Sequence, residues 1–201
     1  METDNKLFPV FFRMDKIQLL MVGGGAVALE KLTALYKHCD NASCITIVAP
    51  EIRDEILQLQ KKFPNQINLK CKPYEKADLK GHNLVISATN IRELNQVVYR
   101  DARNEGVLCN VADMPDICDF YLGSVVKKGS LKLAISTNGK SPTFAKRMRE
   151  WLEAIIPENT EHALDELNEI RAMLKEDFEE KIKKLDEITS VLKPSGEKNK
   201  L

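Results

Sequence analysis

Three short segments of the chain carry residues that could hold a charged ligand or move a proton. One is a glycine triplet, Gly23, Gly24 and Gly25, and the other two are the polar segments 87–90 and 110–113. Each segment lies at the end of an apolar run of the kind that forms a strand. Glycine-rich turns can cradle phosphate groups, and an aspartate such as Asp113 can accept a proton. The three segments therefore predict a ligand site where strand ends converge.

The glycine triplet has the spacing of a dinucleotide-binding turn, with Gly23, Gly25 and Ala28 at its small positions. The first glycine permits a tight reversal, and the second lets the backbone touch a pyrophosphate. The third small residue lets the following helix lie close to the strand. A purely structural turn could use the same residues, so the flanking sequence must decide between a dinucleotide-binding turn and a structural one.

That flanking pattern is typical of a β-α-β unit. Residues 17–22 form an apolar run before the triplet, residues 25–38 have helical spacing, and residues 44–48 form a second apolar run. A unit of this length and order favours dinucleotide binding over a purely structural turn.

Strand and helix patterns continue to alternate after this unit. Strands are predicted at 67–71, 84–87 and 107–111, with helices at 51–62 and 91–104 and a polar connection at 72–83. Such alternation predicts a Rossmann-like α/β fold with a parallel sheet and right-handed crossovers.

The pattern changes after Asp113. Residues 119–127 and 131–137 read as two strands joined by a tight turn, which predicts a hairpin. Ser141 and Pro142 then open a helix, and residues 142–192 keep a helical pattern that is broken once, near Pro157.

The chain therefore divides into three predicted parts. Residues 1–113 form an NAD-binding Rossmann-like domain, 114–141 a hairpin segment, and 142–201 a small C-terminal helical domain. Because an isolated hairpin is only marginally stable in water, we expect it to be buried in a homodimer.

Composition excludes several classes of protein. The formal net charge is zero, so no overall field favours nucleic acid or an anionic membrane. With 43% hydrophobic and 30% charged residues the chain reads as a soluble globular protein, without a secretory signal or a membrane-spanning run. Its five cysteines lack Cys-x-x-Cys spacing, which predicts reduced thiols, no metal cluster and a cytoplasmic location.

The carboxyl ends of parallel strands meet at one sheet edge, so the three polar segments should converge there. Asp113 could act there as an acid or base, although an aspartate before Met114 and Pro115 could equally serve a turn. Glu51 could contact a ribose or simply favour the first turn of a helix. Arg53 has nothing that singles it out for a 2′-phosphate, so NAD is favoured over NADP.

Basic residues surround a second polar loop, residues 136–139. Although charge runs are usually solvated faces, a polar loop that leads into a helix suits a ligand with several carboxylates. The basic residues are Lys127, Lys128, Lys140, Lys146, Arg147 and Arg149.

Five motifs over residues 7–155 resemble those of the precorrin-2 dehydrogenase family, which also forms the N-terminal module of siroheme synthase. The last is the most specific, because a strand that feeds Ser-Thr-x-Gly-x-Ser-Pro and a basic helix is unusual in other dinucleotide-binding folds. The motifs lie at residues 22–28, 48–51, 87–89, 109–113 and 134–142.

The resemblance implies that NAD accepts a hydride from precorrin-2, a tetrapyrrole rich in carboxylates, to give sirohydrochlorin. Some members of the family also insert ferrous iron to give siroheme, and this second activity stays open for the present chain. The family is homodimeric, in agreement with the predicted hairpin.

Site residues follow from the resemblance together with the fingerprint. The family's key acid aligns with Asp113, and Thr137 stands where many members have a serine. Expected cofactor contacts are Gly23, Gly24, Gly25, Ala26, Val27, Pro50, Glu51, Ala88 and Thr89. Expected substrate contacts are Asn110, Ser136, Thr137, Asn138, Gly139 and Lys140.

A second hypothesis is a non-catalytic module that senses NAD and positions its helical tail for a partner. Such a sensor has no need to keep Asp113 together with the loop at 136–140. The joint presence of the two therefore favours the enzyme.

Overall fold

The computed structural model describes residues 5–39, 44–173 and 178–192, which group into two compact units. The first unit comprises the described residues up to Ser124 together with Ser136–Ala145. The second comprises Val125–Ile135 and the described residues from Lys146 onward. This grouping cuts the chain at other points than the three-part division, which stays a prediction.

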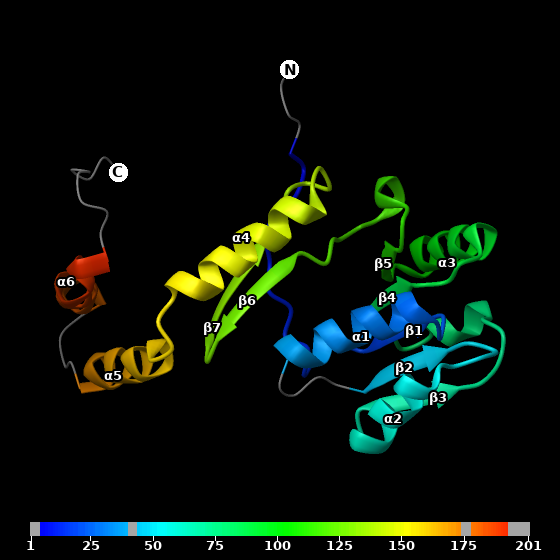
Figure 1. The fold of residues 1–201 in the computed structure, drawn as a ribbon, viewed down its shortest axis with the longest axis horizontal. Coiled ribbons are helices and arrows are strands. Elements are labelled where there is room, and N and C mark those ends of the chain that lie inside the picture. Colours follow the sequence, from blue (N-terminus) through cyan, green and yellow to red (C-terminus); the bar gives the residue numbers. More distant parts are fainter. Residues whose placement is uncertain (1–4, 40–43, 174–177, 193–201) are drawn as a thin grey trace. The chain divides into compact units, whose positions relative to one another are not determined.

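A five-stranded parallel sheet forms the centre of the first unit, with strand order β3-β2-β1-β4-β5 (Figure 1). This arrangement confirms the predicted Rossmann-like fold. The strands are β1 (Leu19–Val22), β2 (Ile45–Val48), β3 (Ile67–Lys70), β4 (Leu84–Ser87) and β5 (Leu108–Val111).

Helical segments cover both faces of this sheet, because alternate strand residues point to opposite sides. Met21 packs in one core cluster with side chains of α1 and α2, and Leu20 packs in another with side chains of α3 and η1. The segments are α1 (Ala26–His38), α2 (Asp54–Lys62), the short 3₁₀ helix η1 (Lys76–Leu79) and α3 (Arg92–Glu105).

Two predicted elements of this unit need correction. The second helix begins at Asp54 rather than at Glu51, because the Arg53 N–H donates to Gly24 O at 3.0 Å and holds the preceding residues against the glycine turn. The connection at 72–83 is not simply polar, since it contains η1 with Asp78 buried.

β6 (Ser124–Lys128) and β7 (Leu131–Ile135) form the predicted hairpin, which belongs to the second unit from Val125 onward. The first strand starts later than expected, because residues 118–120 bond to the edge of β5 instead. At the hairpin turn, Ser130 Oγ donates to Glu161 at 2.7 Å.

The remaining helices are α4 (Pro142–Ile155), which spans both units, α5 (Thr160–Met173) and α6 (Phe178–Ile188), followed by a 3₁₀ turn, η3 (Thr189–Leu192). The predicted break near Pro157 lies between α4 and α5, and residues 174–177 of the predicted helical stretch lie outside the described residues. None of the helices described in these ranges is long and apolar enough to cross a bilayer.

Candidate dinucleotide and acid–base site

The register of the sheet brings the predicted strand ends level with one another. Val22, the last residue of β1, pairs with Val48 of β2 and with Ser87 of β4, and Ser87 pairs with Val111 of β5. The glycine turn and the two polar segments therefore leave the sheet side by side.

Parallel pairing also continues one residue beyond the strands. The Gly23 N–H donates to Val48 O at 2.9 Å, the Ala88 N–H to Val22 O at 2.8 Å, and the Ala112 N–H to Ser87 O at 2.9 Å. These bonds fix the first residue after each of the three strands in one row, so the sheet assembles the site at its carboxyl edge.

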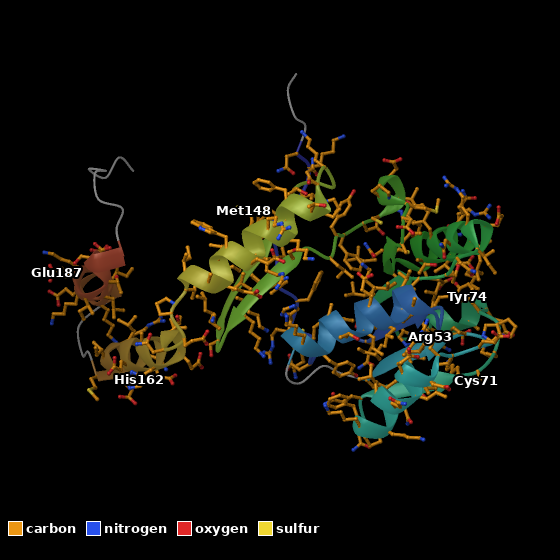
Figure 2. All side chains as sticks on the ribbon, in the orientation of Figure 1. Arg53, Cys71, Tyr74, Met148, His162 and Glu187 are labelled. Carbon is orange, nitrogen blue, oxygen red and sulfur yellow. The ribbon has the colours of Figure 1, made fainter. Side chains whose placement is uncertain are left out.

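This edge includes the point where the chain order of the strands reverses. β1 lies between β2 and β4, so the connections that follow β1 and β4 leave the sheet beside each other. Ligands of open α/β sheets bind at this position. In Figure 2, Arg53, Cys71 and Tyr74 mark connections that leave the same edge farther along the sheet.

Gly23 and Gly24 are required by the packing of the turn itself. Gly23 has a φ of +117°, and a Cβ there would lie 2.4 Å from Ala88 O. A Cβ on Gly24 would lie 2.3 Å from Glu51 O. The two glycines therefore let the β1–α1 turn press against the backbone that follows β4 and β2.

Gly25 has different surroundings, because it is exposed and no described atom lies within 4 Å of the Cβ that it lacks. It is the N-cap of α1, and no described side chain caps the helix. The first backbone N–H groups of α1, on Ala26 and Val27, are therefore available to an anion. An open cradle at an uncapped helix start fits the diphosphate of a dinucleotide.

The segment after β4 is held by a buried asparagine, Asn95 of α3. Its Oδ1 accepts hydrogen bonds from Ser87 Oγ at 2.8 Å and Thr89 Oγ1 at 2.7 Å, and its Nδ2 donates to Thr89 O at 3.0 Å. Sequence reasoning missed Asn95. The only signal was an asparagine on a helical face that otherwise carries apolar residues. Asn95 therefore holds in place the segment that contains the predicted cofactor contacts Ala88 and Thr89.

Pro50 and Glu51 are exposed beside the glycine turn. Glu51 lies ahead of α2, whose first-turn acids are Asp54 and Glu55, so the helix-start alternative for Glu51 is wrong. Its contact with a ribose remains a prediction. The nearby Arg53 guanidinium bonds to Glu55 at 2.6 Å, and this hydrogen bond raises the pKa of Arg53.

Asp113 follows β5 in the left-handed backbone region, with a φ of 58°. The side chain is exposed and has no hydrogen-bond or ion-pair partner among the residues that the structure describes. Aspartate tolerates this conformation better than most residues. The two alternatives for Asp113, a turn-forming residue and an acid–base group, are therefore compatible, because the turn exposes the carboxylate to solvent.

Asn110 is buried, and its Nδ2 donates to Phe120 O at 2.7 Å. This amide group therefore holds the segment that returns past β5. Its predicted contact with substrate stays a prediction.

The loop at 136–140 is a tight turn with two left-handed residues, Asn138 (φ 53°) and Gly139 (φ 75°). The Lys140 N–H closes it on Thr137 O at 3.0 Å, and Ser136 Oγ accepts from the Asn138 N–H at 3.2 Å. Ser136, Gly139 and Lys140 are exposed. This loop belongs to the same compact unit as the sheet.

Several of the basic residues near this loop have acidic partners. On α4, Arg147 pairs with Glu150 at 3.0 Å and Arg149 with Glu153 at 2.8 Å. Lys128 pairs with Glu158 in the second unit. Acidic residues three or four positions along a helix face account for the pairs on α4. These three side chains therefore already have acidic partners, and the predicted role of the basic residues toward a ligand's carboxylates stays a prediction.

A family model described as "Putative NAD(P)-binding" matches residues 10–124. The chain belongs to this family. A second model, of the central part of sirohaem biosynthesis proteins, matches residues 128–155. The two matches together confirm the family resemblance inferred from the motifs, and they support NAD as the cofactor.

Curated relatives of this NAD(P)-binding chain include siroheme synthases. That of Methylococcus capsulatus is 35% identical over 149 residues, which cover 74% of this chain and 30% of the relative. Siroheme synthase 1 of Aeromonas salmonicida is 36% identical over 151 residues, with 75% and 31% covered. The chain thus spans about a third of the length of these relatives.

Among solved structures, SirC, a precorrin-2 dehydrogenase, is similar to this chain with a TM-score of 0.69 and 27% sequence identity. The match covers 90% of this chain and 89% of SirC. It extends over both compact units, and it confirms the predicted architecture of an α/β domain with a hairpin and C-terminal helices.

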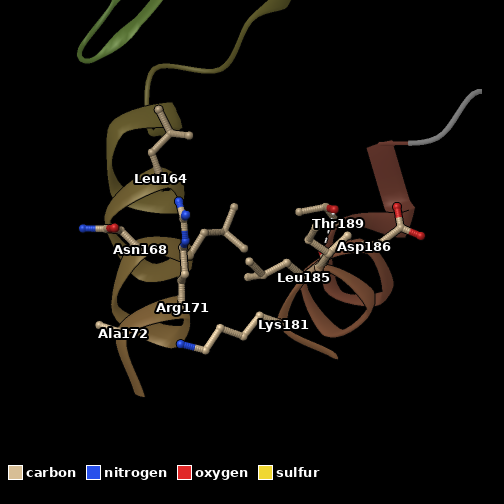
Figure 3. A pocket seen from close by; sticks show the side chains of 10 residues that line it. Leu164, Asn168, Arg171, Ala172, Lys181, Leu185, Asp186 and Thr189 are labelled. Atoms are coloured by element: carbon tan, nitrogen blue, oxygen red, sulfur yellow. Dashed lines mark hydrogen bonds between the residues drawn. The ribbon is translucent and has the colours of Figure 1, made fainter. Parts of the chain in front are cut away.

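A groove of about 940 Å³ lies between α5 and α6 in the second unit of the NAD(P)-binding chain (Figure 3). Leucines 164, 167 and 185 line it together with polar residues such as Arg171 and Lys181. None of the predicted site residues lines it. It is a seam between two amphipathic helices rather than the site at the sheet edge.

Proposed function

We propose that the chain catalyses the NAD-dependent oxidation of precorrin-2 to sirohydrochlorin. The observation that carries the proposal is the exposed Asp113 carboxylate, which the sheet register brings to the same edge as the open turn at Gly25. The likeness to SirC over 90% of the chain supports the choice of substrate. The siroheme synthase relatives support the same biosynthetic role.

The residues at the β1–α1 turn would hold the cofactor. Backbone N–H groups of Ala26 and Val27 would donate to its diphosphate, because α1 starts there without a side-chain cap. The exposed Glu51 would accept from ribose hydroxyls, and Ala88 and Thr89 would border the redox end. When bound, NAD supplies the hydride acceptor.

Asp113 would act as the base. Oxidation removes a hydride and a proton from the substrate, and a carboxylate oxygen of Asp113 would accept that proton. The substrate's carboxylates would bond to the exposed groups of the tight turn, Ser136 Oγ and Lys140 Nζ. Asp113 and the turn at 136–140 belong to one compact unit, which is consistent with both contacting the same substrate molecule.

Insertion of ferrous iron into sirohydrochlorin, with iron as a second substrate, is a further prediction from the family. Asp113 could take the displaced pyrrole protons. Within the described ranges no group of three or more His, Cys, Asp or Glu side chains is placed to hold a metal ion. An iron-insertion assay on sirohydrochlorin would decide this activity.

We also propose that the enzyme is a cytoplasmic homodimer. Phe144, Trp151 and Ile155 lie on one face of α4, and each is more than half exposed. Met148, labelled in Figure 2, lies on the same helix face. Large apolar side chains gathered in this way mark an interaction surface, and a second copy would bury them together with the hairpin.

The decisive experiment supplies precorrin-2 and NAD to the folded protein and follows the absorbance of NADH. We expect turnover, and we expect Asp113→Asn to lower it by about 10²–10⁴-fold with NAD affinity unchanged. Asparagine tolerates the same left-handed backbone, so this variant tests the carboxylate and not the turn. If NAD binds and no NADH forms, the sensor hypothesis is favoured instead.

A further inference from the structure

β5 is the edge strand of the sheet, and its outer edge is closed by residues that return from the Asp113 turn. The Cys109 N–H donates to Asp119 Oδ2 at 3.0 Å, and the Asp119 N–H donates to Cys109 O at 2.8 Å. Asn110 holds Phe120 O from the same strand. Residues 118–120 thus form a strap, which replaces the missing neighbour strand.

The thiol of Cys118 is the part of this strap that contacts the Asp113 turn. The Val111 N–H donates to Cys118 Sγ at 3.2 Å, and Sγ lies 3.3 Å from Val111 O and 3.4 Å from Met114 O. The thiol therefore bridges the residues on both sides of Ala112 and Asp113. The direct bond across this turn, from the Met114 N–H to Val111 O, is 3.4 Å long and correspondingly weak.

We infer that Cys118 is a positioning residue, whose thiol holds the left-handed turn that presents the Asp113 carboxylate. The inference rests on the proposed function, in which Asp113 is the base. A left-handed aspartate lies in a sparsely populated backbone region, and such a conformation persists only where its surroundings fix it. Here the surroundings include the thiol contacts with Val111 and Met114, beside the bond from the Ala112 N–H to Ser87 O.

The chemistry of the side chain suits this role. One sulfur accepts from an N–H and has a single hydrogen to donate to one of the two carbonyl oxygens. A thiolate could not donate. Burial, reinforced by the charge of Asp119, raises the pKa of Cys118 against the opposing Val111 N–H bond, so the thiol stays protonated.

The test compares Cys118→Ala with Cys109→Ala. Cys109 is a fully buried thiol two residues before Val111, whereas Cys118 is partly buried, so the loss of Cys109 should disturb packing at least as much without removing a contact to the turn. We expect Cys118→Ala to lower kcat by about 10–100-fold with the KM for NAD unchanged. Without the thiol contacts the Asp113 carboxylate would shift, and even a small displacement of a catalytic base lowers the rate of proton transfer. Cys118→Ser, which keeps a donor and acceptor, should recover part of the loss.

A double variant separates positioning from general damage. If Cys118 acts through Asp113, then adding Cys118→Ala to Asp113→Asn should change turnover by less than about twofold. Thermal unfolding of every variant reports whether the fold is intact.

Equal kcat values for the Cys118 and Cys109 variants would overturn the inference, and so would a full Cys118 effect in the Asp113→Asn background. If Asp113→Asn itself keeps full turnover, the proposed base is wrong, and the inference falls with it. If Asp113→Asn is slow but Cys118→Ala is normal, the inference alone fails.

Discussion

Gly24 and Gly25 are neighbours in the chain and face opposite surroundings. A Cβ on Gly24 would meet the Glu51 carbonyl oxygen, whereas a Cβ on Gly25 would meet no described atom within 4 Å. Gly24 therefore serves the fold, and Gly25 leaves room for a ligand. Substitutions at these two neighbouring positions should therefore have different effects: one at Gly24 on stability, and one at Gly25 on ligand binding.

We predict that Gly24→Ala lowers the free energy of unfolding by about 1–3 kcal/mol, because backbone must shift to admit the methyl group. Gly25→Val should change the free energy of unfolding by no more than about 1 kcal/mol, since valine at an N-cap has only a modest cost. The same variant should abolish NAD binding. Denaturant titration and NAD titration of both variants check this pair, and normal NAD affinity in Gly25→Val would contradict the assigned diphosphate position.

Sequence reasoning found residues whose role is local and missed those whose role depends on distant contacts. Gly23 and Asp113 were visible because they lie within two residues of a strand end. The steric role of Gly24 depends on Glu51, and Asn95 acts on Ser87, so neither shows in a local pattern. The contact of Cys118 with Val111 likewise appears only in three dimensions.

At the scale of elements, η1 is organised by a buried carboxylate. Asp78 accepts from Lys72 Nζ at 2.8 Å, from Lys70 Nζ at 3.1 Å and from the Glu75 N–H at 3.1 Å. Burial alone would raise the pKa of Asp78, but these hydrogen bonds outweigh it and hold the pKa below the usual 3.8. The carboxylate thereby ties the end of β3 to η1.

We predict that Asp78→Asn lowers the free energy of unfolding by about 1–3 kcal/mol at neutral pH. A lowered folded-state pKa stabilises the fold above the unfolded value, and this contribution is lost as the pH falls through the folded pKa. The difference between wild type and variant should therefore be full above pH 3.8 and shrink below it. Denaturant titrations across that range provide the check, and a difference independent of pH would contradict it.

The start of α4 has the cap that the sequence predicted. Ser141 Oγ accepts from the Phe144 N–H at 3.1 Å, and Pro142 is the first helical residue. We predict that Ser141→Ala costs about 1 kcal/mol of folding free energy. Thr143→Ala, an exposed change in the same turn, is the matched control and should cost less. Equal losses in denaturant titration would argue against the cap.

The order of the strands and helices could be predicted from the alternation of their sequence patterns, but the residues at which they begin could not. The second helix starts late because Arg53 bonds to Gly24, and the first hairpin strand starts late because Asp119 bonds to β5. In both cases a tertiary hydrogen bond overrides the local propensity. Polar residues at 72–83 concealed η1, because its buried charge is stabilised by lysines outside it.

For the whole molecule, the exposed apolar face of α4 leads to a prediction about assembly. Trp151→Asp should shift the protein from dimer toward monomer, because it places a charge in the proposed interface. Lys146→Asp, on the opposite side of the helix, is the control and should leave the dimer intact. Sedimentation equilibrium measures both, and an unchanged dimer in Trp151→Asp would exclude this face.

The fold class was predictable because the parallel sheet imposes its alternation of strands and helices over nearly half of the sequence, from Leu19 to Val111. The grouping of Ser136–Ala145 with the sheet was not, since no local pattern reports which unit a connecting turn joins.

The dihedral angle at position 113 restricts which amino acids can be tried there. Glycine, asparagine and aspartate enter the left-handed region most readily, and of these only aspartate carries a carboxylate. Backbone geometry thus restricts the residues that fit position 113 before any requirement for reactivity applies. A mutational survey of this position should therefore find few substitutions that leave folding untouched, glycine and asparagine foremost, and neither of these replaces the proton acceptor that the wild-type carboxylate provides.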